Sequence, residues 1–321
     1  MIKNRFHYKI RQIKVQRCFM SRYINVAAIH FQVEENLQER KKQSAFNQFH
    51  EAEKLLDHTG VDLVVTCEGM ESVAQTIDDA ETVSHPGPVL SMYQEFAARN
   101  KCTLAGSLKL KENLNVYNAL VFIGPDGKVL GDYRKVFLTD GEIAKGLACG
   151  KSAKTTVTPA GILGGIICFD LNFDELRDQY AALRPDILCF SSMFHGAHLQ
   201  PNWAFKCRSF MAAACKDNSS DITDPLGRTV ASANFYGRIA RAKINIDRFV
   251  MHQNFNITLF PDVLRKYKNE VYIDASPALG TAVLYSMSEK HTARSIAGEF
   301  GLIEIDDFFS AGYAMAVRNR R

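Results

Sequence analysis

The chain of 321 residues has no apolar run close to the roughly 20 residues that a membrane-spanning helix needs. Its longest apolar stretch, Gly161–Cys168, is interrupted by glycines and has the length of a buried strand. Internal repeats, linkers and low-complexity segments are also missing, although the length allows one large domain or two. We therefore expect no membrane partner and a globular chain with a sizeable core.

Close cysteine spacings are missing as well. The eight cysteines form no CxxC pair, which argues against a disulfide framework or a zinc ribbon. Several stand within apolar runs, as Cys189 does in Asp186–Phe190, and this is typical of reduced, buried thiols in a cytoplasmic protein. Zinc held by Cys189, His195 and His198 is an alternative, but their spacing matches no usual ligand set. We therefore expect neither a metal nor another cofactor.

Acidic residues are missing before Glu34, whereas the first 22 residues carry seven basic ones: Lys3, Arg5, Lys9, Arg11, Lys14, Arg17 and Arg22. Removing these seven charges from the net charge of +4 leaves −3 for the remainder, so nothing predicts a nucleic-acid-binding face. Residues 1–22 also lack the apolar segment of a secretory signal. We interpret them as a disordered basic leader. A targeting peptide, or an upstream extension with Met20 as the natural start, are the alternatives.

Strand-like apolar runs alternate with helical periods up to about residue 200, which predicts α/β layers. Strands are expected at 23–32, 61–66, 102–108, 118–123, 129–133, 161–168, 186–190, 219–223, 228–233 and 238–245. Helices are expected at 34–58, after Pro88, at 176–183 and at 201–214. We place one domain at 23–250. Residues 251–321 then form an extension packed on that domain.

Three reactive side chains come directly after predicted core strands: Glu68, Lys135 and Cys168. The carboxyl ends of strands in α/β sheets are where ligand sites gather. A buried glutamate needs a partner, and Lys135 can supply it. On spacing alone, a structural ion pair beside one of eight inert cysteines is the simpler interpretation.

The local sequence around these residues points to catalysis instead. Asp62–Glu68 (DLVVTCE), Gly131–Leu138 (GDYRKVFL) with Glu142, and Gly164–Phe173 (GGIICFDLNF) resemble, in order, the three signature blocks of the carbon–nitrogen hydrolase (nitrilase) superfamily. The gap of 33 residues from Lys135 to Cys168 is also typical of that family. The resemblance extends from about Tyr23 to Val250.

The resemblance implies a four-layer α-β-β-α sandwich and a homodimer, or a higher homo-oligomer, formed through helices near the site. It makes Glu68, Lys135 and Cys168 the Glu-Lys-Cys triad, and Glu142 the second, positioning glutamate. The reaction implied is hydrolysis of a non-peptide carbon–nitrogen bond in a small amide, with release of ammonia or an amine.

The residue types suit that chemistry. An amide carbon is a poor electrophile, so Cys168 must become a thiolate, and Glu68 can take its proton and later activate water. Lys135 favours the thiolate and faces the oxyanion, while the backbone N–H of Phe169 is the expected second oxyanion donor. A thioester intermediate then follows.

Three departures from the family pattern concern the pocket more than the triad. Cys67 stands where a proline often precedes the first glutamate, and Asn172 where many relatives carry Arg or Trp. Between Ala214 and Ser219, about 20 residues that usually include a strand are shortened to Cys215–Asn218. We expect the loss of this segment either to open the substrate pocket or to leave the C-terminal extension to form that part of the pocket.

Other readings remain open. A papain-like pair would use His195 or His198 as the base, but the cysteine context of that fold is absent. These two histidines, with Asn172 and Trp203, are instead candidate pocket residues. A member of the fold that binds proteins without catalysis is a further alternative, although such a protein gains nothing from an intact triad.

The substrate is predicted only by class. Nitrile or N-carbamoyl hydrolysis is the alternative within the family. The carbamoyl hydrolases tend to have an arginine where Leu171 and Asn172 stand, and Phe169-Asp170 resembles the Tyr-Asp of the amidase branches more than the Trp-Glu of nitrilases. We therefore expect a small amide as the substrate.

Overall fold

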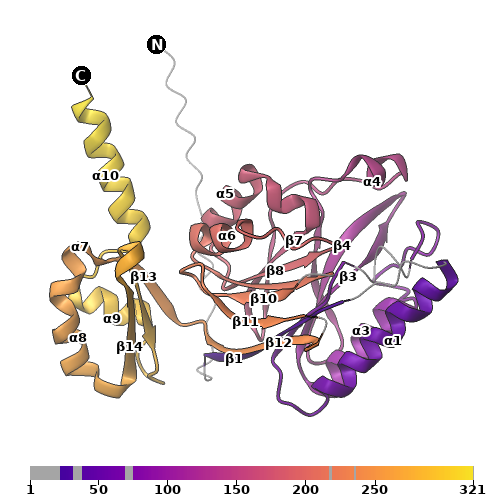
Figure 1. The fold of residues 1–321 in the computed structure, drawn as a ribbon, viewed down its shortest axis with the longest axis horizontal. Helices are drawn as coiled ribbons and strands as arrows, with labels where there is room; N and C mark the ends of the chain where they lie inside the picture. Colours follow the sequence, from indigo (N-terminus) through magenta and orange to yellow (C-terminus); the bar gives the residue numbers. More distant parts are fainter. Residues whose placement is uncertain (1–21, 32–37, 69–74, 217–218, 235, 321) are drawn as a thin grey trace.

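The structure is a computed structural model that describes residues 22–31, 38–68, 75–216, 219–234 and 236–320 (Figure 1). The expectation of a disordered leader therefore falls almost entirely outside the described residues. In the part of the chain that is described, no helix is long and apolar enough to cross a membrane.

Two six-stranded sheets pack face to face in the larger lobe. The first has the order β12-β1-β2-β3-β4-β5 and consists of β1 (Tyr23–Ile29), β2 (Leu63–Val65), β3 (Thr103–Glu112), β4 (Asn115–Ile123), β5 (Val129–Arg134) and β12 (Ile239–Asn245). The second has the order β11-β10-β9-β8-β7-β6 and consists of β6 (Thr155–Thr158), β7 (Gly161–Ile167), β8 (Ile187–Ser192), β9 (Phe210–Cys215), β10 (Ser220–Thr223) and β11 (Thr229–Ala233).

Helices cover both outer faces of this pair of sheets. α1 (Gln38–Leu56) and α3 (Pro88–Asn100) lie on the first sheet, and α5 (Asp174–Leu183) and α6 (Leu199–Cys207) lie on the second (Figure 1). The start of α3 shows how the sequence sets these layers: the carboxylate of Glu81 accepts the backbone N–H groups of Gly87, Val89 and Leu90, which a helix leaves unpaired. The predicted four-layer α-β-β-α sandwich is confirmed.

Parallel pairing brings the expected site residues to one region. β2 lies parallel between β1 and β3, and β8 lies parallel between β7 and β9. Glu68 follows β2 and Cys168 follows β7, while the two sheets approach closely between them. A Cβ on Gly165 of β7 would lie 2.5 Å from the Cβ of Tyr133 on β5, so only glycine allows this contact.

The helix expected at 201–214 was wrong in its second half. α6 ends at Cys207, Arg208 adopts a positive φ of 57°, and β9 begins at Phe210. Every residue of β9 is buried, so the strand shows no polar alternation, and its three alanines fit a helical period equally well. The strand that seemed lost between Ala214 and Ser219 is present as β9, between β8 and β10. The expected loss of part of the sheet was therefore also wrong.

The extension has a core of its own. It contains β13 (Arg248–His252), α7 (Gln253–Asn256), α8 (Phe260–Tyr267), β14 (Val271–Ser276), β15 (Thr281–Ser286), α9 (Ala293–Phe300) and α10 (Ile305–Asn319). Its three strands pair in the order β13-β15-β14, and they pack on α8 and α9 through a separate apolar cluster. The boundary expected at residue 250 falls within β13.

Ion pairs and a small apolar cluster join the extension to the sandwich. Asp306 contacts Arg184, at the end of α5, and Arg208, at the end of α6. Leu226 of the sandwich shares an apolar cluster with three extension residues, Val250, Val283 and Ile305. The extension therefore touches the helices of the second sheet and lies as a second lobe beside them (Figure 1).

Candidate active site

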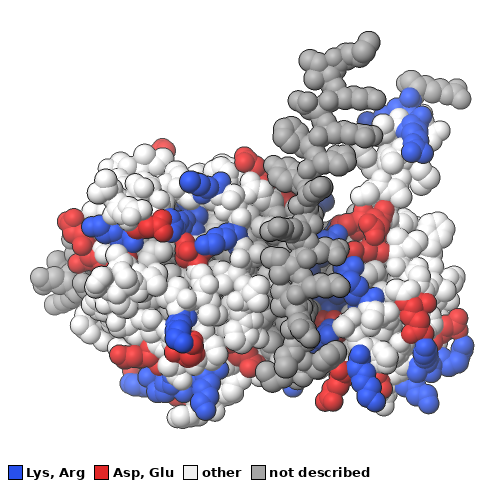
Figure 2. Space-filling model, turned by 180° about the vertical axis from the view of Figure 1, so that it is seen from behind, with Lys and Arg blue, Asp and Glu red and all other residues white. Residues whose placement is uncertain are grey.

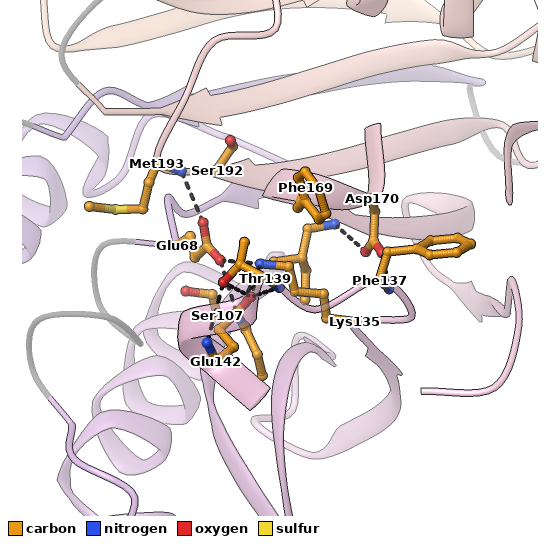
Figure 3. A network of polar contacts seen from close by, with 12 residues as sticks. Glu68, Ser107, Lys135, Phe137, Thr139, Glu142, Phe169, Asp170, Ser192 and Met193 are labelled. Carbon is orange, nitrogen blue, oxygen red and sulfur yellow. Dashed lines mark hydrogen bonds and ion pairs between the residues drawn. The ribbon is translucent and has the colours of Figure 1, made fainter. Parts of the chain in front are cut away.

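The buried Glu68 and the partly buried Glu142 hold the ammonium group of Lys135 between them. The Lys135 Nζ lies 3.1 Å from Glu68 Oε1, and 2.9 Å from each of the two carboxylate oxygens of Glu142. Figure 3 shows the three side chains converging from separate segments of the chain. All three N–H groups of the ammonium can be satisfied by these carboxylate oxygens, so the lysine is held as a cation.

A short helix places Glu142 for this contact. α4 (Asp140–Ala144) begins with a capping box: Thr139 Oγ1 accepts the backbone N–H of Glu142, and Glu142 Oε2 accepts the backbone N–H of Thr139 at 2.8 Å. The same carboxylate therefore caps the helix and binds Lys135. This explains why the glutamate stands seven residues after the lysine.

Asn118, which no motif in the sequence marks, joins the two glutamates. Its side-chain Nδ2 donates to Glu68 Oε1 at 2.9 Å and to Glu142 Oε1 at 2.8 Å, and the residue is fully buried. The signal in the sequence was a polar residue within the apolar strand β4. Its position opposite Lys135 follows from the pairing of β4 with β5, which sequence spacing does not show.

The remaining oxygen of Glu68 is fixed from the second sheet. Glu68 Oε2 accepts the backbone N–H of Met193 at 3.0 Å, directly after β8 (Figure 3). The carboxylate also interacts with the thiol of Cys168 and raises its pKa. Glu68 is thus held by Lys135, Asn118 and Met193 and stands next to the sulfur.

Cys168 lies at a sharp turn after β7. Its φ of 46° is in the left-handed region, which a residue with a side chain seldom adopts and which marks a strained, over-determined position. A 3₁₀ turn follows at Cys168–Asn172. Burial raises the pKa of the Cys168 thiol to about 12, and repulsion by Glu68 adds to this, whereas Lys135 opposes it. The resting thiol is therefore protonated and needs a base before it can attack.

Asp170 fixes this turn to the loop that carries Lys135. Its carboxylate accepts the Tyr133 hydroxyl at 2.8 Å and the backbone N–H groups of Ile167, Val136 and Phe137 at 3.1, 3.1 and 2.8 Å. Burial raises the pKa of Asp170 to about 7, although these donors pull it down. In the sequence, Asp170 stands out only in the Phe169-Asp170 pair that resembles the family. No local pattern indicated that it links the segment of Cys168 to that of Lys135.

The charged groups of the site shift one another's pKa values. Burial alone would lower the pKa of Lys135, but Glu68, Cys168 and Glu142 together raise it above its usual value. Burial would raise the pKa of Glu142, but hydrogen bonding and attraction to Lys135 lower it. Lys135 and Glu142 are therefore both charged at neutral pH.

The other candidate residues are arranged around this centre in different ways. Phe169 follows the sulfur and packs edge-on against Phe173, while the exposed Asn172 donates to the Phe169 carbonyl at 3.0 Å. Trp203 lies in the core and donates to the Leu171 carbonyl at 2.9 Å, so it supports the turn rather than facing open space.

The two histidines differ from each other. His195 Nε2 lies 2.7 Å from Asp221 Oδ2, and its Nδ1 accepts the backbone N–H of Ala197, so both ring nitrogens are engaged away from the triad. His198 is exposed at the start of α6. Neither has the geometry of a base for Cys168. Among the described residues, no group of three or more His, Cys, Asp or Glu side chains forms a metal site.

Several proteins of known sequence resemble this chain. The deaminated glutathione amidase of Mus musculus is 25% identical over 255 residues, which are 68% of this chain and 78% of that protein. The omega-amidase NIT2 of Homo sapiens is 27% identical over 191 residues, 51% of this chain and 68% of that protein. The match with the chloroplastic omega-amidase of Arabidopsis thaliana is 31% identical but spans only 32% of that protein.

Solved structures share the fold. Nit3 of Saccharomyces cerevisiae, a member of branch 10 of the nitrilase superfamily, superposes with a TM-score of 0.58 at 21% identity, over 71% of this chain and 92% of its own. An amidase from Nesterenkonia sp. AN1 gives a TM-score of 0.59 at 16% identity, over 70% of this chain and 90% of its own. The carbon–nitrogen hydrolase family profile matches residues 32–249, which contain Glu68, Lys135 and Cys168. This chain therefore belongs to the carbon–nitrogen hydrolase family.

Proposed function

We propose that this protein is an amidase that hydrolyses a non-peptide carbon–nitrogen bond of a small amide through a thioester on Cys168. The observation that carries the proposal is the contact of one carboxylate, Glu68, with both the Cys168 thiol and the Lys135 ammonium. A structural ion pair needs no thiol at a strained turn beside it, whereas a nucleophile needs its base and cation in these places.

Each step of the reaction can be assigned to a group of the site. Glu68 takes the Cys168 proton as the sulfur bonds to the amide carbon, and negative charge develops on the former carbonyl oxygen. Lys135 and the Phe169 backbone N–H stabilise that oxyanion. When the carbon–nitrogen bond breaks, Glu68 returns the proton to the leaving nitrogen, so that ammonia or an amine departs.

The second half repeats these roles with water. Water gives a proton to Glu68 and attacks the thioester carbon, the carbon–sulfur bond breaks, and the sulfur regains its proton. The product is a carboxylic acid, and the net reaction consumes one water. The Nesterenkonia amidase supports a cysteine adduct in this fold, since it shows covalent addition of the acetamide moiety of fluoroacetamide at its active-site cysteine.

The substrate class follows from the relatives and from the turn. The matched relatives include omega-amidases and deaminated glutathione amidases, so ω-amides of small carboxylic acids are the first compounds to test. Leu171 is buried and Asn172 is the exposed side chain of the turn. No arginine of this turn can hold the carboxylate of a carbamoyl amino acid, which favours amides over N-carbamoyl compounds.

The cysteines favour a reducing, cytoplasmic location. All seven cysteines in the described residues are free, and five of them are buried. Free thiols are typical of proteins kept in a reducing compartment. We place the enzyme in the cytoplasm on this basis.

The test is an ammonia-release screen over small amides, nitriles and N-carbamoyl compounds with three variants. Cys168→Ala, Lys135→Ala and Glu68→Gln should each lower kcat by orders of magnitude, because the three groups act as a unit. Intact-mass analysis with a slow substrate should show an acyl adduct on the peptide that contains Cys168. Cys67→Ala is the matched control, because Cys67 is also buried next to the site and donates to the Ser192 carbonyl.

Three results would contradict the proposal. An adduct on Cys67 would identify a different nucleophile. Substantial turnover by Glu68→Gln would remove the assigned base. A wild-type protein that releases no ammonia from any of the three compound classes would favour a protein-binding role for the fold.

A further inference from the structure

The last helix of the extension projects from the body of the molecule. α10 begins in contact with the extension, where Ile305 is buried and the Phe308 ring stacks on His252 at 4.3 Å. From Phe309 to Arg320 every residue is exposed, and the helix points away from both lobes (Figure 1). More than half of this helix therefore packs against nothing in the described part of the chain.

The composition of that free part does not suit exposure to water. Residues 308–317 contain no charged side chain. Phe309, Tyr313, Met315 and Val317 are 46%, 67%, 61% and 43% exposed. Helices shorter than about 12 to 15 residues are marginal in water, and most helices in proteins gain stability by packing an apolar face. Such a segment is stable when another surface covers it.

We propose that α10 pairs in an antiparallel way with α10 of a second copy of this chain. Phe309, Tyr313 and Val317 are four residues apart and so lie on one face of the helix. A twofold axis at Tyr313 places the two tyrosines together and packs Phe309 against Val317 of the second copy at each end. This is the self-complementary pattern that a twofold interface requires.

The charges at the two ends of α10 favour the antiparallel orientation. Its first turn carries Asp306 and Asp307, and its end carries Arg318 and Arg320. With the axis at Tyr313, Asp307 lies level with the segment between Arg318 and Arg320 of the second copy. A parallel pair would instead place acid beside acid and arginine beside arginine. The opposed helix dipoles add to the same preference.

The area of the apolar face is sufficient for a dimer contact. Each copy exposes large parts of two aromatic rings together with Val317, and Phe255 of α7, 72% exposed, extends the patch next to Phe308. Covering these side chains in both copies buries on the order of 1,000 Å², the lower end of specific interfaces. α10 lies outside residues 32–249, the part that matches the family. The contact is therefore separate from the helices beside the active site.

The test measures the oligomeric state of the full chain by light scattering after size exclusion and by sedimentation, over a range of micromolar concentrations. The wild type should form dimers through α10, or tetramers where the helices near the site also pair two copies. Tyr313→Asp places two carboxylates against each other at the twofold axis and should raise the dimer dissociation constant by at least about tenfold. Tyr313→Phe should keep the dimer. Leu114→Asp is the matched control, since Leu114 is 98% exposed between β3 and β4 in the sandwich, and it should have no effect.

Charge reversal tests the orientation without touching the apolar face. Asp307→Arg should weaken the dimer, as should Arg318→Asp combined with Arg320→Asp, and the variant with all three changes should recover it. A monomeric wild type would overturn the proposal. So would an assembly whose mass Tyr313→Asp leaves unchanged, because another surface would then hold all of its copies together. Binding of the wild type to phosphatidylserine vesicles through α10 would show that a lipid surface is the occupant instead.

Discussion

Replacing Asn118 by alanine tests whether its hydrogen bonds position Glu68 in addition to stabilising the fold. The change removes two hydrogen bonds to carboxylates, at 2.9 Å and 2.8 Å, from a fully buried site. Hydrogen bonds to charged groups contribute about 1.5–3 kcal/mol each, so the free energy of unfolding should fall by about 3 kcal/mol or more. Glu68 then keeps only Lys135 and Met193 as fixed donors, and a displacement of about 1 Å costs about a hundredfold in rate. We expect kcat to fall by about that factor, with a smaller change in KM.

Asn245→Ala is the matched control for this prediction. Asn245 is also a buried asparagine with two side-chain hydrogen bonds, to the Ser286 carbonyl at 2.7 Å and from the Asp247 N–H at 2.9 Å, but it lies at the end of β12. Its loss should also lower the melting temperature, by less because both partners of Asn245 are uncharged, while kcat stays unchanged. Steady-state ammonia release and thermal unfolding of both variants provide the comparison. If Asn118→Ala is folded and its kcat stays within a few-fold of the wild-type value, Asn118 has no part in positioning Glu68.

Three further predictions address the reaction, the thiol and the turn. When an alkyl amide is compared with its parent nitrile, the amide should have the higher kcat/KM, because its trigonal carbonyl already directs the oxygen toward Lys135 and Phe169. A nitrile that is hydrolysed faster than its amide would refute this. Without substrate, the rate of alkylation of the peptide that contains Cys168 should rise about tenfold per pH unit from pH 7 to 10, because the thiol pKa of about 12 lies above that range. A rate that does not change with pH would mean that the resting cysteine is a thiolate. Activity should fall below about pH 7, because protonation of Asp170, whose raised pKa is about 7, weakens its hydrogen bonds to four donors. If Asp170→Asn shows the same fall in activity at low pH, another group is responsible for that fall.

The proximity of Glu68, Lys135, Glu142 and Cys168 could be predicted from the sequence because the blocks around them resemble, in order, the signature blocks of the family. Glu68, Lys135 and Cys168 each come shortly after a strand, and a strand that ends at a sheet edge presents the next residues to the site. Glu142 lies in a capping box, a pattern fixed by hydrogen bonds between neighbouring residues. Chain order and spacing alone favoured a structural ion pair beside an inert cysteine, and the resemblance of the three sequence blocks to the family supplied the rest.

Asn118 and Asp170 could not be found in the same way, because their partners are distant in sequence. Asn118 meets Glu68 across 50 residues, and Asp170 meets Val136 across 34. Strand register and the close approach of the two sheets decide such contacts, and neither leaves a local pattern. The same limit explains β9, where complete burial removed the alternation that marks a strand.

The extension was difficult to predict for a related reason. Its strands are short, and β13 pairs with β15 across about 30 residues, so the second core becomes visible only once that pairing is known. Residues 251–321 showed helices and strands in the sequence but no partner for them. A packed tail and a lobe with its own sheet give the same local signals.

Glu68 and Glu142 have different electrostatic roles in the proposed mechanism. Glu68 and Glu142 bring two negative charges to Lys135, so the cluster carries a net charge of −1 while the thiol is protonated. Proton transfer from Cys168 to Glu68 keeps that total and moves the negative charge from carboxylate to sulfur. Lys135 then loses one anionic partner, yet its two contacts with Glu142, at 2.9 Å each, keep it charged. The N–H group released from Glu68 becomes free to turn toward the developing oxyanion, so that formation of the nucleophile and activation of the lysine are one event.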